Sequence, residues 1–134
     1  MEFIIDRSTW RCGGDNNDDS SNNEKGLGET ALLNREGFMC CLGQVSKQLG
    51  ATEEMLLEHA EPCDVEKLFD LDENCVLLNE AGLQTLLTID AMSINDDYGI
   101  NIKEKEKQLK SLFSEHLIKL KFIGKSVSNK KKSK

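Results

Sequence analysis

The sequence predicts an α+β fold: a small, mainly antiparallel sheet with two to four helices packed on one of its faces. Three observations lead to this prediction. A short apolar strand opens the chain, an alternating apolar strand closes its folded part, and segments with helical spacing lie between them. We expect the two terminal strands to be neighbours in the sheet. A chain of 134 residues has room for one domain with one core.

The first strand is expected at residues 2–6, where Phe3 and Ile5 share one face and Ile4 lies on the other. The last strand is expected at residues 117–123, where apolar side chains alternate with lysines in the same way. Each strand therefore has one buried face and one solvated face.

Residues 30–33 are expected to form a brief strand that leads into the central helix of the fold. Asn34 is placed to cap that helix, and Gly50 suits the left-handed position at its end. Apolar side chains at helical spacing define its buried face: Phe38, Cys41, Leu42, Val45 and Leu49.

Further elements follow in order. Thr52 can cap a second helix that ends before Pro62, and residues 75–78 are predicted to form a buried strand. Residues 83–94 are apolar enough for the core, but their type is undetermined. Asn101 is expected to cap the longest helix. The buried side of this last helix should comprise Ile102, Leu109, Leu112, Phe113 and His116.

Two segments of the chain echo each other. Residues 32–37 and 77–82 both read Leu-Leu-Asn-x-x-Gly, with four identities in six positions. A duplicated strand–turn–helix unit would explain the match. The same order of residues is so common before helices that coincidence is the preferred interpretation.

Charge and composition divide the chain into a body and a tail. Residues 1–124 form the expected domain, with a mobile loop at about residues 13–28 that is rich in Asp, Asn and Ser. Residues 125–134 carry five lysines and no acid, and are expected to be disordered. Without them the body has 12 basic and 24 acidic residues, a net charge of −12. Such a body repels nucleic acid, so direct nucleic-acid binding is unlikely outside the lysine tail.

The sequence shows no signal for export or membrane insertion, which predicts a cytoplasmic protein. The start of the chain has no apolar segment long enough for a signal peptide, and no run approaches the length of a membrane span. Five cysteines, an odd number, are expected to remain thiols in a chain that is not exported. We therefore expect a cytoplasmic protein with no membrane partner.

Four residues are candidates for a reactive or metal-binding role: Cys12, Cys40, His59 and Cys63. Cys41 should face the core, which leaves Cys40 nearer a surface, where a thiol needs a base or a cation to become reactive. Structural zinc sites draw their ligands in pairs two to four residues apart. Only His59 and Cys63 have a comparable spacing, so no cofactor is predicted.

Three further residues are candidates for binding: Trp10, Asp96 and Asp97. Trp10 stands between two arginines and just before paired glycines, although a tryptophan in such a place usually packs over the edge of a core. Asp96 and Asp97 precede a helix, where acidic residues commonly serve as caps or as solvent-facing charges. Both interpretations stay open for each of these residues.

Four segments together resemble a group of short proteins carried by phages and integrated mobile elements. They are residues 6–13, residues 32–34, residues 37–43 (Gly-Phe-Met-Cys-Cys-Leu-Gly) and residues 94–97 (Ile-Asn-Asp-Asp). The likeness spans roughly residues 3–123, and its most specific part is Met-Cys-Cys-Leu-Gly. The resemblance implies a mobile-element context, and it assigns no activity to the chain.

The sequence thus favours a non-enzymatic, acidic accessory protein of phage or mobile-element origin that acts by binding another protein. The partner would be a host or element-encoded protein, and the action would include inhibition of a host or defence factor. The alternative is a small cysteine- or metal-dependent enzyme. A homo-oligomer is also compatible with the sequence.

Overall fold

The computed structural model describes residues 1–12, 30–97 and 99–125, and all structural statements below concern these residues. The loop predicted at residues 13–28 lies outside them. So does the predicted lysine-rich tail apart from Lys125, which is exposed.

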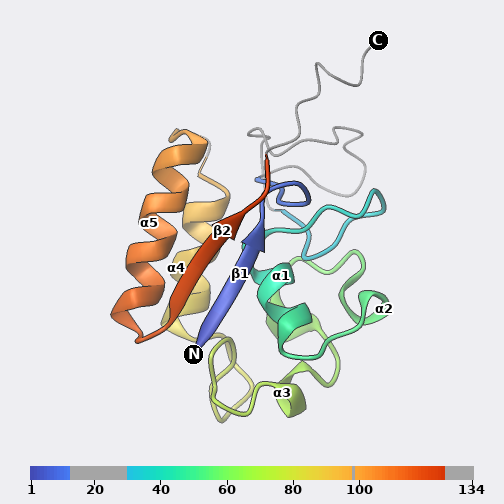
Figure 1. Ribbon diagram of the computed structural model, residues 1–134. Helices are drawn as coiled ribbons and strands as arrows, with labels where there is room; N and C mark the ends of the chain where they lie inside the picture. The colour runs from blue at the N-terminus through green and yellow to red at the C-terminus, as the bar shows by residue number, and fades with distance from the viewer. Residues whose placement is uncertain (13–29, 98, 126–134) are drawn as a thin grey trace.

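The sheet of the described chain consists of two parallel strands, β1 (Glu2–Asp6) and β2 (Lys119–Ile123) (Figure 1). Their apolar residues lie opposite each other in the pairs Phe3–Leu120 and Ile5–Phe122. The prediction of a mainly antiparallel sheet is therefore wrong. Alternation defines which face of a strand is buried but is the same for both directions. The direction is set by the helices, which return the chain to the end of the molecule where β1 begins.

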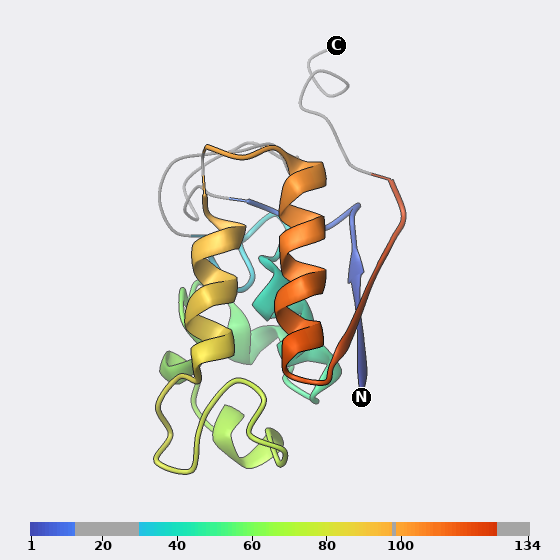
Figure 2. The same cartoon turned by 90° about the vertical axis from the view of Figure 1, so that its left-hand side faces the viewer.

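The helices of the described chain lie on one side of this sheet (Figures 1 and 2). α1 packs against β1, α5 packs against β2, and α4 packs against both helices. The opposite face of the sheet is open, with Ile4 and the strand lysines exposed. The described chain has five helices, more than the two to four predicted. They are α1 (Cys41–Gln48), α2 (Glu53–Leu56), α3 (Leu68–Leu71), α4 (Leu86–Asn95) and α5 (Ile102–Glu115), with a 3₁₀ turn at Pro62–Asp64.

The central helix begins later than predicted. α1 starts at Cys41, and Asn34 caps a turn instead, because its Oδ1 atom accepts the amides of Glu36 and Phe38, each at 2.9 Å. The strand predicted at residues 30–33 is absent from the described structure. Leu33 makes a single parallel bridge to Leu57.

The prediction of a strand at residues 75–78 is also wrong. The buried carboxylate of Asp72 accepts the amides of Val76, Leu77 and Leu78 at 2.7–2.8 Å, so it takes the place of a neighbouring strand. The second helix, capped by Thr52 as predicted, ends after one turn.

The longest helix is capped by Asn101 as predicted, but its buried side differs from the prediction. His116 is exposed, whereas Lys105 is completely buried.

The two Leu-Leu-Asn-x-x-Gly segments share one local structure. The side chain of Asn79 accepts the amides of Ala81 and Leu83 at 2.8 and 3.1 Å, just as Asn34 does in its own turn. The glycine of each turn has a positive φ, +91° at Gly37 and +79° at Gly82. α1 and α4 begin at the same offset from the two asparagines. The same short sequence thus forms the same turn in both places, which both interpretations, coincidence and duplication, predict.

The third residue of α1 and the third residue of α4 each contact the carbonyl group of the first leucine in the preceding segment. In the first segment Gly43 lies against the Leu32 carbonyl, and a Cβ atom at Gly43 would stand 1.8 Å from that oxygen. In the second segment the Thr88 hydroxyl donates to the Leu77 carbonyl at 2.8 Å. The absence of a side chain in one unit and a hydroxyl in the other both allow the helix to lie against the preceding segment.

Gly43→Ala is expected to lower the free energy of unfolding by at least about 2 kcal/mol, because the atom that the new methyl group meets is backbone and cannot rotate away. Urea unfolding followed by circular dichroism measures this. Gly99→Ala is the control, since the nearest atom there is a side-chain oxygen at 3.2 Å. Equal stability of the two variants would contradict the close contact.

Candidate functional site

Four of the seven candidate residues converge in one buried cluster. Trp10 is fully buried, Cys12 and Cys40 are nearly so, and Asp96 is partly buried beside them. The residue that joins them is Asn95, the last residue of α4, which sequence reasoning did not select. We call this cluster the Asn95 network.

The amide of Asn95 is saturated with hydrogen bonds. Its Oδ1 atom accepts the indole N–H of Trp10 at 2.7 Å and the backbone N–H of Cys41 at 3.2 Å. Its Nδ2 group donates to the Arg11 carbonyl at 3.1 Å and to Asp96 Oδ1 at 3.0 Å. The side chain therefore connects the segment after β1, the start of α1 and the end of α4.

Lys105 closes the network from α5. Its buried ammonium donates to the carbonyl oxygens of Asn95 at 2.6 Å and Ile94 at 3.3 Å, which are among the last carbonyls of α4. A cation at a helix C-terminus is electrostatically favourable. The carboxylate of Asp96 accepts the hydroxyl and the amide of Thr30. Burial raises the pKa of Asp96, against the effect of these hydrogen bonds.

The thiols of this cluster are poor candidates for chemistry. Burial raises the pKa of Cys12 and of Cys40 to about 12, and it raises the pKa of Cys41 as well. A thiol in this state holds its proton at neutral pH, whereas nucleophiles and metal ligands are thiolates. No hydrogen bond joins a histidine side chain to a thiol anywhere in residues 1–12, 30–97 and 99–125.

The other three candidate residues lie apart from the network. Asp97 is exposed, and its carboxylate accepts the Gly99 amide at 2.8 Å in the turn before α5. Cys63 is exposed and lies with Glu61 and Asp64, whose ligand atoms are within 4.8 Å of one another and of its sulfur. His59 is not part of that group. Partial burial and these two acids raise the pKa of Cys63, so its thiol is not activated either.

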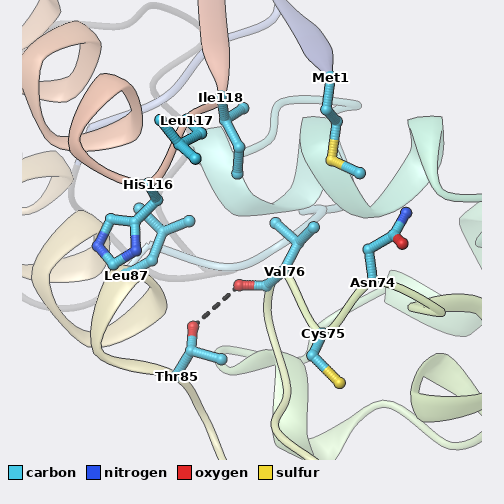
Figure 3. A pocket seen from close by; sticks show the side chains of 9 residues that line it. All are labelled: Met1, Asn74, Cys75, Val76, Thr85, Leu87, His116, Leu117 and Ile118. Atoms are coloured by element: carbon cyan, nitrogen blue, oxygen red, sulfur yellow. Dashed lines mark hydrogen bonds between the residues drawn. The ribbon is translucent and has the colours of Figure 1, made fainter.

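A hollow lies elsewhere, at the end of the molecule where both strands begin (Figure 3). It measures about 400 Å³. Met1 and Ile118 face Asn74 and Val76 across it, while the Cys75 sulfur points away. The full lining is Met1, Asn74, Cys75, Val76, Thr85, Leu87, His116, Leu117 and Ile118.

Leu117 on the rim of this hollow is 89% exposed and has φ = +63°. It occupies the residue after the cap of α5, where the amides of Leu117 and Ile118 return to Ser114 and Phe113 at 2.9 and 3.0 Å. Glycine is the usual residue in this left-handed position. A leucine there costs about 1 kcal/mol of strain and gains nothing from burial. Cys75, also on the lining, has φ = +53°.

A groove of about 350 Å³ lies between α4 and α5, and Glu115 on its lining directly precedes His116 of the hollow in the chain. Two large apolar residues of α4 are exposed beside it, Leu86 at 72% and Ile89 at 49%. The groove is lined by Asp90, Ser93, Ile94, Gln108, Ser111, Leu112 and Glu115. We call the hollow and this groove together the α4–α5 surface.

None of the seven candidate residues lies on the α4–α5 surface. Leu86 and Ile89 fall in the apolar stretch of residues 83–94, whose type was undetermined, and a long apolar stretch reads equally well as core. The available signal was a leucine at residue 117, directly after a helix, where glycine is the usual choice.

Comparisons with protein-family models, with curated proteins and with solved structures find no match to this chain. Across the helices that the structure describes, none combines the length and the apolar character that crossing a bilayer requires.

We expect three of the five thiols to be unreactive in the native protein, because Cys12, Cys40 and Cys41 are buried and protonated. Titration with a chromogenic disulfide reagent at pH 8 should consume two thiols, those of Cys63 and Cys75, and all five in urea. Cys40→Ala should leave the native count unchanged, whereas Cys75→Ala should lower it by one. Fast reaction of a third native thiol would contradict this assignment.

Asn95→Ala is expected to cost about 2–4 kcal/mol of stability, because the buried N–H groups of Trp10 and Cys41 lose their acceptor. Urea unfolding followed by the fluorescence of Trp10, the only tryptophan, measures it. The control Asn74→Ala, at an exposed asparagine, should change stability by less than about 0.5 kcal/mol. A similar midpoint for both variants would show that Asn95 does not hold the fold.

Proposed function

We propose that this protein acts without catalysis, by binding another protein through the α4–α5 surface. The observation that carries the proposal is Leu117, an exposed leucine in a backbone conformation that favours glycine. Neither packing nor local geometry explains that residue. Strained residues persist where function requires them, and exposed apolar residues around a concave surface are typical of interaction sites.

The further parts of the proposal rest on charge and on the resemblance noted above. The acidic body favours a partner with a basic surface, such as a nucleic-acid-binding host or defence protein whose action would be blocked. The segments at residues 37–43 and 94–97 support an origin in a phage or mobile element, and the chain composition supports a cytoplasmic location.

The alternative of a cysteine-dependent enzyme receives no support from the geometry. Its leading candidates, Cys12 and Cys40, are closed to substrate and have raised pKa values. Cys63 is open to solvent, but the negative charges of its neighbours Glu61 and Asp64 disfavour the thiolate that a nucleophile requires.

Leu117→Gly separates binding from folding. Glycine tolerates the positive φ, so the free energy of unfolding should not fall and should increase by at most about 1 kcal/mol. Recovery of partner proteins from lysate of the source cells should nevertheless fall, because the exposed side chain is lost. Quantitative affinity purification with the tagged full-length chain measures recovery, and urea unfolding measures stability.

The matched control is Ile123→Thr, which removes an exposed apolar residue at the other end of β2. It should leave partner recovery unchanged. If no protein is enriched over a tag-only sample, or if both variants recover the same partners in the same amounts, the proposed function is wrong.

A further inference from the structure

We infer that the groove between α4 and α5 accommodates an amphipathic helix of the partner, one that carries lysine or arginine beside its apolar residues. This inference rests on the proposed function and adds to it the class of ligand and the part of the surface that receives it.

The shape of the groove suits a helix. α4 and α5 lie side by side along their length (Figure 2), and such pairs receive a third helix in the furrow between them. Ile94 and Leu112 form the apolar floor. Leu86 and Ile89 precede Asp90 and Ser93 by one helical turn, so α4 presents an exposed apolar row beside that floor.

The charges on the groove have one sign. Asp90 and Glu115 are the charged residues of its described lining, and both are acidic and exposed. Glu104 extends the row on α5, where it accepts a hydrogen bond from Gln108 at 3.0 Å. Lys110 of α5 lies on another side of the helix, because its ammonium stands 5.9 Å from the centre of the Phe122 ring.

This distribution selects among the occupants. A nucleic acid would bring phosphates against Asp90 and Glu115, which is unfavourable. A second copy of the chain would bring the same two acids against each other. A helix with basic residues on both sides of its apolar stripe can pack its apolar side chains on the floor and pair its basic side chains with Asp90 and Glu115. The partner is therefore expected to present Leu-like anchors at i, i+3 or i+4 and i+7, flanked by lysine or arginine.

A synthetic peptide tests the inference directly. The probe is a 14-residue helix of leucine at positions i, i+3, i+4 and i+7 with lysine elsewhere, and its counterpart has glutamate in place of every lysine. In ¹⁵N spectra of the full chain, the lysine peptide should shift the amide signals of the groove lining. The glutamate peptide should cause no shifts.

Charge reversal supplies the matched comparison. The double variant Asp90→Lys/Glu115→Lys should bind the lysine peptide roughly tenfold more weakly or worse. The control Glu54→Lys/Glu66→Lys changes the net charge by the same amount at exposed sites outside the groove and should bind nearly as well as the unaltered protein. Equal weakening of both variants, or shifts outside the groove, would overturn the inference.

Two further outcomes keep the inference distinct from the proposed function. If Leu117→Gly loses the cellular partner while Asp90→Lys/Glu115→Lys retains it, the inference fails and the proposed function stands. If no cellular partner is recovered at all, the proposed function fails whatever the peptide does. Groove signals that shift with protein concentration alone, together with a dimer in sedimentation, would show that a second copy is the occupant and overturn the inference.

Discussion

The side chain of Asn95 is the interaction on which the rest of the structure depends. It satisfies the indole of Trp10, the first amide of α1 and the carbonyl of Arg11, while the backbone carbonyl of Asn95 accepts a hydrogen bond from the ammonium of Lys105. Each of these groups is buried, and an unsatisfied buried donor or acceptor costs about 1–3 kcal/mol. The ends of α1, α4 and α5 and the segment after β1 are therefore held in one arrangement, because a shift of any one would leave another group without a partner.

The parts of the fold that follow from local chemistry could be predicted from sequence. Alternation located both strands and their buried faces, and Asn101 marked the start of α5. The direction of β2 could not be predicted, since it depends on where the helices return the chain. The apolar run at residues 75–78 was wrongly predicted to be a strand, because the Asp72 carboxylate accepts the hydrogen bonds of its amides in place of a neighbouring strand. A buried Lys105 is invisible to periodicity for a similar reason, as its partners are carbonyls at the end of another helix.

The candidate residues divide in the same way. Trp10, Cys12, Cys40 and Asp96 attracted attention as chemical groups, and the structure does bring them together. Trp10 and Asp96 form hydrogen bonds within the Asn95 network, and burial raises the pKa of the two thiols. The type of a residue shows which reactions its side chain could take part in, whereas burial decides whether a substrate can reach that side chain. The α4–α5 surface was missed because the exposed side chains beside its groove, Leu86 and Ile89, are ordinary apolar residues. Their exposure depends on how α4 is turned, which no local pattern in residues 83–94 specifies.

The Asn95 network and the α4–α5 surface are connected through α4. One side of this helix is fixed at both ends, by the Thr88 hydroxyl on the Leu77 carbonyl and by the Asn95 network. The other side carries Leu86 and Ile89 into solvent. A surface held by buried hydrogen bonds loses little conformational freedom when a ligand binds, so more of the contact energy remains for affinity. Under the proposed function, the buried polar groups have no chemical role of their own; they give an exposed apolar face a fixed shape.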